Sequence, residues 1–390
     1  EAARMGISVS PLELRLAVGQ IKAFQNDKGD FDPAAYASSE TGRNFVDQAR
    51  FLLEHPQEDD PAVFAFWKEK GLRKELHHWT EGDIRSKWAS FVPVDAKEGE
   101  KRPLLIVLHG AHNPIYLAEF YGYTHIAAAE RLCVLIPEDE NLENLERLLA
   151  YAKANMPVDT ARVYLVGYSF GGFRASISGL HRPELFAGLG IGGMIYGGSD
   201  GESDLNVGKI HSVLDGTTDP LPDAAIHYDP LPVTEETIRR AAKVRMPVVH
   251  FVGENEFTSV APFCKGKDLS GGRLRMDAEG KTWGVQLWRR VNGCKTYAVE
   301  ECIRGALASQ NETERKLGTL LDETKVELHE GRKYYLGDCV SADGMRITRF
   351  GLIEGAPHWP TVSLPRLTWE FLKRFSRDPV TGQLRQEERA

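Results

Sequence analysis

The sequence lacks several features that define large classes of protein. It has five cysteines in 390 residues, loosely spaced and without a Cys-x-x-Cys pair, which excludes a disulfide framework. No apolar run approaches the roughly 20 residues that a membrane-spanning helix needs. Basic residues are not in excess, since 48 Lys and Arg face 56 Asp and Glu, and the net charge of -8 argues against a nucleic-acid or anionic-membrane surface. There is no internal repeat and no low-complexity tract.

The bulk composition is that of a soluble globular protein, with 42% hydrophobic and 27% charged residues. The length suits one large domain with additions, or two domains. Cys133 lies in an apolar run, and we expect it to be a small core residue. Cys294 and Cys302 could pair in an oxidising compartment. The compartment stays open between the cytoplasm and a secretory route, and we favour the cytoplasm.

Strand patterns alternate with helix patterns from residue 88 onward. The continuous apolar run Leu104–Leu108 is typical of a strand buried on both faces. Strands that alternate with helices indicate a mostly parallel, doubly wound sheet of the α/β class. The predicted strands are 88–94, 104–108, 132–136, 161–166, 186–191, 248–252 and 346–353, and the predicted helices include 125–131, 144–154, 234–243 and 367–375.

The rest of the chain departs from this alternation. We expect residues 1–85 to form a helical N-terminal extension and residues 86–390 to form the α/β domain. Two insertions, near 196–245 and 295–340, interrupt the pattern, and the second contains a charged helix and a possible hairpin. Long insertions after strands of such sheets usually form caps over the site, so we expect a cap here.

The segment Gly167-Tyr168-Ser169-Phe170-Gly171-Gly172 lies between a predicted strand and a predicted helix. Strand, Gly-x-Ser-x-Gly and helix in this order form the pattern of a nucleophile elbow. Side chains at positions 167 and 171 would collide with the neighbouring strand and helix, which explains the glycines. The tight turn lifts the Ser169 hydroxyl clear of the sheet edge.

A serine hydroxyl is a poor nucleophile at neutral pH, so it needs a base, and the base needs an orienting acid. The expected chain order is Ser, acid, His. The strand 248–252 runs into a turn that contains two carboxylates, and we favour Glu256 as the acid, with Glu254 as its rival. His358 lies in a Gly- and Pro-rich loop after the strand 346–353, where a base is expected.

The oxyanion of an acyl-transfer reaction needs backbone N–H donors. We expect these to be Phe170, directly after the nucleophile, and Ala111, in the loop after residues 104–108. His109 and His112 in the same loop could suggest a metal pair, but a third ligand at a recognisable spacing is missing, so we expect no metal. The candidates for the wall of the substrate pocket are His109, His112, Tyr168 and Trp359.

Five further motifs occur in the chain: Pro103–Gly110, Pro157–Tyr164, Pro183–Ala187, Trp288–Cys294 and Pro357–Pro360. Together they resemble the poly(3-hydroxybutyrate) depolymerase and feruloyl or acetylxylan esterase group of α/β-hydrolases. The resemblance covers roughly residues 88–195, 246–300 and 346–375. It implies an α/β-hydrolase fold and serine esterase chemistry without a cofactor, with Ser169 as nucleophile, His358 as base and an acid at Glu256, where that group more often has Asp.

Three functions remain in competition at this point. The leading one is a serine carboxylesterase with a Ser-His-Glu triad, acting on a small-molecule or polymer-derived ester. A peptidase or amidase with the same triad is the second. A non-catalytic binding protein on the same fold is the third. If the insertions form a lid, a small substrate is expected, whereas an open groove would admit a polymer.

Overall fold

The structure, a computed structural model, describes residues 51–110, 115–195, 231–254, 284–356 and 360–387, apart from 52, 53, 56, 82, 83 and 194. The strands are β1 (Leu72–Glu81), β2 (Ile84–Pro93), β3 (Arg102–Leu108), β4 (Cys133–Pro137), β5 (Val158–Tyr168), β6 (Gly188–Gly192), β7 (Val248–Gly253), β8 (Glu323–His329), β9 (Arg332–Val340), β10 (Arg346–Ile353), β11 (Phe375–Arg377) and β12 (Leu384–Gln386). The helices are α4 (Pro61–Glu69), α5 (Ile115–Glu119), α6 (Tyr123–Glu130), α7 (Leu142–Asn155), α8 (Phe170–His181), the 3-10 helix η2 (Pro183–Leu185), α10 (Glu235–Val244), α11 (Gly284–Val291), α12 (Val299–Ala308), α13 (Glu312–Leu317) and α14 (Leu364–Leu372).

Ten of the described strands form one sheet in the order β1-β2-β4-β3-β5-β6-β7-β10-β9-β8. The six central strands, from β4 to β10, are parallel to one another, whereas β1, β2, β9 and β8 pair in antiparallel fashion at the two edges. The carboxyl ends of the parallel strands therefore meet along one edge of the sheet. All seven strands that the sequence predicted lie in this sheet, which confirms the mostly parallel, doubly wound architecture.

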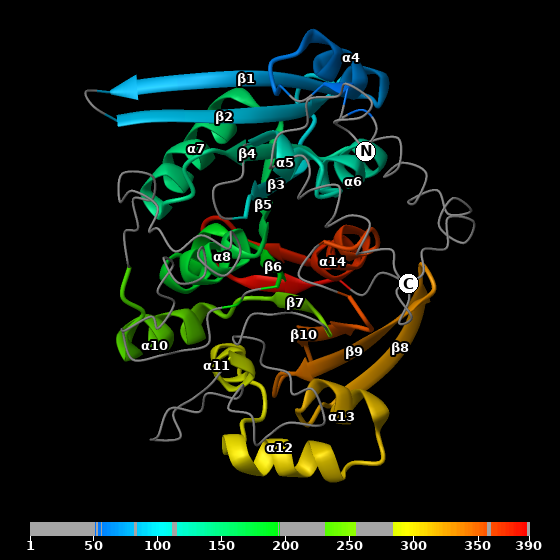
Figure 1. Ribbon diagram of the computed structural model, residues 1–390. Coiled ribbons are helices and arrows are strands. Elements are labelled where there is room, and N and C mark those ends of the chain that lie inside the picture. The colour runs from blue at the N-terminus through cyan, green and yellow to red at the C-terminus, as the bar shows by residue number, and fades with distance from the viewer. Residues whose placement is uncertain are drawn as a thin grey trace, which may run out of the picture.

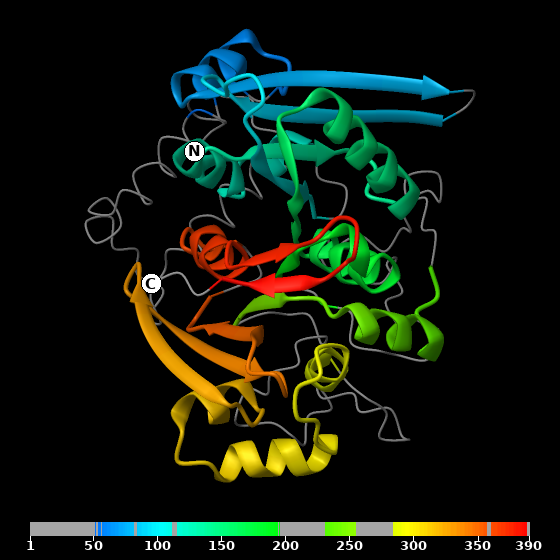
Figure 2. The same ribbon diagram turned by 180° about the vertical axis from the view of Figure 1, so that it is seen from behind.

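The central strands form because their residues are apolar on both faces. Every residue of β4, β6 and β7 is buried, and β3 is partly exposed only at its first residue. Helices cover both sides of the sheet: α7, α8 and α10 lie on one side, and α6 and α14 lie on the other (Figures 1 and 2). This double cover is what a parallel sheet with hydrophobic runs requires.

The described part of residues 1–85 differs from the predicted helical extension. Residues 61–69 form helix α4, but residues 72–81 form β1, which pairs with β2 and joins the main sheet. The sequence of β1 does not show the alternation of apolar and polar residues that is typical of a strand, because a charged residue, Lys74, occupies a position on the buried face. Residues 1–50 lie outside the described residues, so the domain division at residue 85 stays a prediction.

Lys74 is tolerated in the core because it has partners there. Its ammonium lies 2.5 Å from the carboxylate of Glu119 at the end of α5, and both side chains have no solvent exposure. Lys74 also donates to the backbone carbonyl of Glu58 at 2.7 Å, and the Trp67 indole of α4 donates to Glu119 at 3.0 Å. One buried ion pair thus joins α4 and β1 to α5.

The second insertion contributes to the sheet as well. Its predicted hairpin is confirmed as β8 and β9, joined at Glu330 and Gly331, whose φ angles of 48° and 74° suit a two-residue turn of the hairpin type. β9 pairs with β10, so the hairpin extends the sheet beside the strand that leads to the predicted base. α13 packs on β9 and β10 at the same place. The first insertion lies mostly outside the described residues.

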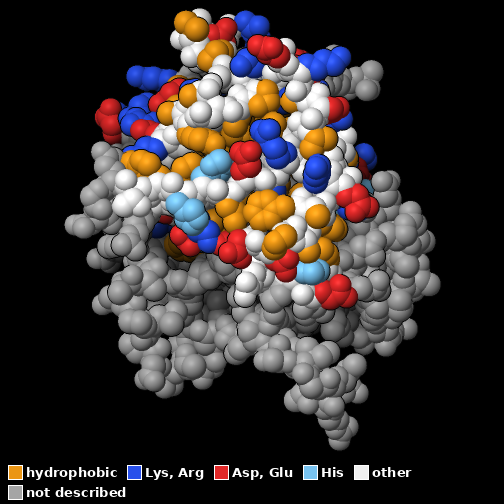
Figure 3. All heavy atoms as spheres, turned by 90° about the horizontal axis from the view of Figure 1, so that it is seen from above, with side chains coloured by type: hydrophobic (Ala, Val, Ile, Leu, Met, Phe, Trp, Pro, Cys, Tyr) orange, Lys and Arg blue, Asp and Glu red, His pale blue; other side chains and the backbone are white. Residues whose placement is uncertain are grey.

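The four described cysteines, Cys133, Cys294, Cys302 and Cys339, are buried and free, so Cys294 and Cys302 do not pair in this structure. Cys133 is a core residue of β4, as expected. Among the described residues, no helix combines the length and apolar character needed to traverse a bilayer. The face seen from the side of β1 and β2 carries acidic and basic side chains interspersed with hydrophobic ones in its described part (Figure 3).

The turn that contains Ser169 is the last feature that defines the fold. β5 ends at Tyr168, α8 begins at Phe170, and Ser169 between them has φ 56° and ψ -120°. A doubly wound sheet with a strained serine at a strand-to-helix turn on its carboxyl edge is the α/β-hydrolase fold. The chain adopts this fold.

The buried ion pair generates a first prediction. Glu119→Ala should lower the free energy of unfolding by about 3–5 kcal/mol, because it leaves the Lys74 ammonium buried without a counter-charge. Glu143→Ala removes an exposed partner of Arg147 on α7 and should change stability by less than about 1 kcal/mol. Urea unfolding of both variants measures the difference. An equal loss in the two would contradict the role of the buried pair.

Candidate active site

Ser169 occupies a strained backbone conformation at the carboxyl edge of the sheet. Its φ of 56° combined with a ψ of -120° lies outside the regions that L-residues ordinarily adopt. Two glycines make the turn possible. A Cβ on Gly167 would overlap the backbone of Gly171, and a Cβ on Gly171 would overlap the carbonyl oxygens of Leu108 and His109. The collisions predicted from the sequence are therefore present at both glycines.

The turn is fixed from several sides. The Ser169 N–H donates to the Gly192 carbonyl at the end of β6, at 2.8 Å. Tyr168 is only 5% exposed, and its ring lies against Gly192 and in edge contact with Tyr121. This burial favours a supporting role for Tyr168 under the turn. The Phe170 ring, half-buried, stacks on Phe173.

The loop after β3 begins against this turn. The imidazole of His109 has both nitrogens near backbone carbonyls: Nδ1 lies 2.7 Å from the Gly110 oxygen and Nε2 lies 2.9 Å from the Glu138 oxygen. Its side chain is 12% exposed. These contacts favour the interpretation of His109 as a residue that packs and hydrogen-bonds the loop. The Gly110 N–H donates to the Tyr121 hydroxyl at 2.8 Å.

Of the two rival acids, Glu254 is described. Its carboxylate accepts from the Lys316 ammonium of α13 at 2.8 Å and from the Gly355 N–H at 3.0 Å, and its side chain is 25% exposed. Glu254 therefore ties the end of β7 to the segment that follows β10, three residues before His358. The Lys316 pKa is raised: burial lowers it, but the carboxylates of Glu254, Glu354 and Glu312 together outweigh burial.

The second insertion holds the same segment. The Glu354 N–H donates to the Lys333 carbonyl at 2.9 Å, and the Arg332 guanidinium donates to the Glu354 carbonyl at 3.0 Å. The Tyr335 hydroxyl donates to the Glu354 carboxylate at 3.4 Å and to Glu312 at 3.1 Å. The start of the predicted base loop is thus bonded to β9 and α13 as well as to β7.

The remaining predicted residues, Ala111, His112, Glu256, His358 and Trp359, lie outside the described residues. Their predicted roles stay predictions. Three residues that were not predicted from the sequence contact predicted site residues or their neighbours: Glu140, Tyr121 and Lys316. Glu140 could have been found, because it follows β4 closely in a Glu138-Asp139-Glu140 run and the ends of parallel strands meet at one edge.

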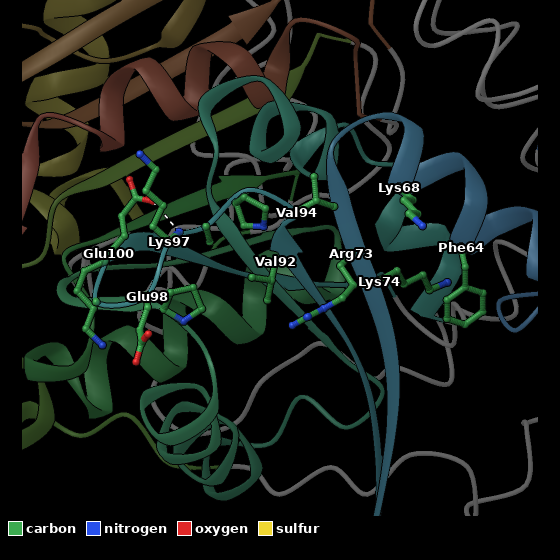
Figure 4. A pocket seen from close by; sticks show the side chains of 14 residues that line it. Phe64, Lys68, Arg73, Lys74, Val92, Val94, Lys97, Glu98 and Glu100 are labelled. Atoms are coloured by element: carbon green, nitrogen blue, oxygen red, sulfur yellow. Dashed lines mark hydrogen bonds between the residues drawn. The ribbon is translucent and has the colours of Figure 1, made fainter.

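The described residues contain no group of three or more His, Cys, Asp or Glu side chains placed to hold a metal ion. An open cleft of about 590 Å³ lies at the opposite edge of the sheet, beside the end of β2 and the loop before β3 (Figure 4). Pro157, just before β5, also lines it, so the cleft is remote from Ser169 at the other end of that strand. Its charged lining includes Lys68, Arg73, Lys97, Glu98, Glu100 and Lys101.

No known family profile and no curated protein matches the chain. Among solved structures, it is similar to the S-formylglutathione hydrolase FrmB of Staphylococcus aureus, at 14% identity and a TM-score of 0.37, over 48% of this chain and 78% of that one. It is similar to esterase Est22 at 20% identity and a TM-score of 0.34, over 61% of this chain and 80% of that one. It is similar to the Pyrococcus horikoshii acylaminoacyl peptidase at 17% identity and a TM-score of 0.33, over 52% of this chain and 35% of that one. All three TM-scores lie below 0.5, so the fold is assigned from the strand order and the serine turn.

The strain at Ser169 can be measured without any substrate. Relief of a strained φ and ψ by glycine is worth about 1–3 kcal/mol, against roughly 0.5–1 kcal/mol for the greater freedom of glycine in the unfolded chain. Ser169→Gly should therefore be more stable than Ser169→Ala by about 1 kcal/mol in urea unfolding. A less stable glycine variant would contradict the strain.

Proposed function

We propose that the protein is a serine hydrolase that cleaves a carboxylic ester through an acyl-enzyme. The observation that carries the proposal is the strained Ser169 between β5 and α8, since backbone strain of this kind persists where a function requires the geometry. The turn places the hydroxyl at the sheet edge where β7 and β10 also end, and these strands lead to the proposed acid and base.

In the proposed reaction, the Ser169 hydroxyl attacks the ester carbonyl carbon while His358 takes its proton. The tetrahedral oxyanion collapses, the carbon–oxygen bond to the alcohol breaks, and the alcohol leaves with the proton from His358. Water, deprotonated by His358, then attacks the acyl carbon, the bond to the Ser169 oxygen breaks, and Ser169 regains the proton from His358 as the acid leaves. Glu256 holds the imidazolium that forms in each step.

Two backbone amides serve the oxyanion in this proposal. Phe170 directly follows Ser169 and is the first residue of α8, whose first-turn N–H groups point towards the start of the helix. They lie at the positive end of the helix dipole, which favours a negative oxygen. In the facing loop, the Gly110 N–H is already bonded to Tyr121, which supports the next amide, that of Ala111, as the second donor.

The contacts of Glu254 support Glu256 as the acid. Both oxygens of Glu254 accept hydrogen bonds that fasten β7, α13 and the segment after β10 together. We assign Glu254 this anchoring role and Glu256 the role of orienting His358.

Ser169→Ala should abolish hydrolysis of p-nitrophenyl esters, by about 10⁶-fold in kcat, because the nucleophile acts as a unit with its base. The measurement is a series from acetate to octanoate plus ferulate, together with labelling by a fluorophosphonate. The chain-length profile sizes the acyl pocket. If the wild type is labelled and hydrolyses matched amides but not esters, the result would favour the hypothesis of a peptidase. A protein that is neither labelled nor active would contradict the proposal of a serine hydrolase.

Glu256→Gln should lower kcat by about 10⁴-fold, the effect of losing the acid that orients the base. Glu254→Gln is the matched control, and it should cost at most about tenfold, because the amide oxygen can still accept from Gly355. The same ester assay on both variants, with urea unfolding to verify folding, measures this. The opposite order of losses would assign the acid to Glu254.

A further inference from the structure

The hydrogen bonds of His109 define its charge. Carbonyl oxygens only accept hydrogen bonds, and the two ring nitrogens of His109 each lie within 2.9 Å of one. A neutral imidazole has a hydrogen on one nitrogen and a lone pair on the other, so it would direct that lone pair at a carbonyl oxygen. Only the imidazolium, with a hydrogen on both nitrogens, satisfies the two contacts.

A carboxylate is present to balance this charge. The Glu140 Oε1 atom lies 3.6 Å from the His109 Nδ1 atom, and the Glu140 side chain is 6% exposed. Burial of a single charge is costly, whereas a buried pair compensates much of that cost. The other charged groups that act on the pair are Arg174 of α8 and Asp139, which act on Glu140, and Glu138, which acts on His109.

The pKa of His109 agrees with this geometry. Burial acts to lower it, but the Glu140 carboxylate and the Gly110 and Glu138 carbonyls outweigh burial, and the His109 pKa is raised above its ordinary value. Burial raises the pKa of Glu140 to about 7, against the opposing effects of His109 and Arg174. The imidazolium is the state we assign at neutral pH.

The position of His109 indicates what its charge acts on. Its own carbonyl oxygen touches Gly171, at the start of α8, so His109 lies directly against the nucleophile turn. Its Nδ1–H holds the oxygen of Gly110. A peptide unit is planar, so a bond that holds its carbonyl also restrains its N–H. A charged donor on the carbonyl also polarises the peptide and strengthens its N–H as a donor.

We propose that His109 is a positioning residue: Glu140 keeps it as an imidazolium, and it fixes and polarises the Gly110–Ala111 peptide that donates to the oxyanion. The inference rests on the proposed function for the role of that peptide. The charge of His109 does not depend on it, and it can be measured on the protein without a substrate.

The first test is ¹⁵N NMR of the histidine side chains, with the His109→Gln spectrum identifying the signals of His109. Between pH 7 and 8 both His109 nitrogens should have the shifts of a protonated ring. In Glu140→Gln the His109 pKa should fall by about 1–3 units, as expected on loss of a nearby opposite charge. Glu143→Gln, an exposed change on α7, is the matched control and should leave the signals unchanged.

The second test is the pH dependence of ester hydrolysis. Because the imidazolium is the active form, kcat should fall at alkaline pH as His109 loses its proton. A lower His109 pKa in Glu140→Gln should move this alkaline limb to lower pH by the same shift that NMR records. Above the limb kcat should drop about 10–100-fold, less than the loss of a whole oxyanion donor, with a smaller change in KM.

A lone-pair nitrogen on His109 at pH 7–8 in the wild type would overturn the proposal. A Glu140→Gln protein that is folded in urea unfolding and has a shifted His109 pKa, but an unmoved alkaline limb, would overturn the positioning role. A protonated His109 in a wild type that neither reacts with fluorophosphonate nor hydrolyses esters would instead overturn the proposed function.

Discussion

The candidate site depends on the close approach of the first turn of α8 to the end of β3. Gly171 has no Cβ, and only its absence lets the helix lie against the carbonyl oxygens of Leu108 and His109. The contact brings the amide of Phe170, the turn of Ser169 and the loop after β3 into one small region. A methyl group at this point would move the loop away from the serine, whatever the other residues did.

Where the residues on one strand were all apolar, the sequence predicted the fold well. Continuous apolar runs make up most of β3, β4 and β7 and the second half of β5, and Gly-x-Ser-x-Gly marks its turn through sterics that depend on neighbours in the chain. β1 was missed because its buried face contains Lys74, whose place depends on Glu119, 45 residues further along. The local sequence pattern gives no information about a partner that only the tertiary fold brings close.

The candidate site likewise contains residues that the local sequence predicts and residues that it does not. Ser169 and Phe170 are fixed by local sequence, so their geometry could be predicted from it. The supporting contacts come from other parts of the chain: Glu140 follows β4, Tyr121 lies between α5 and α6, and Lys316 belongs to α13 in the second insertion. None of them has a motif of its own. A charged pair such as His109 and Glu140 is recognised only when the ends of two strands are seen together.

The placement of the second insertion has a consequence for how the chain folds. β7 and β10 pair directly, with Val248 opposite Thr348, although 100 residues separate them in sequence. Closing a loop of this length costs on the order of 4 kcal/mol of chain entropy before the pairing can repay it. Such non-local pairings form slowly. The segment before His358, fastened to β7, β9 and α13, is thus expected to be ordered late, after β3, β4 and β5 have already assembled around Ser169.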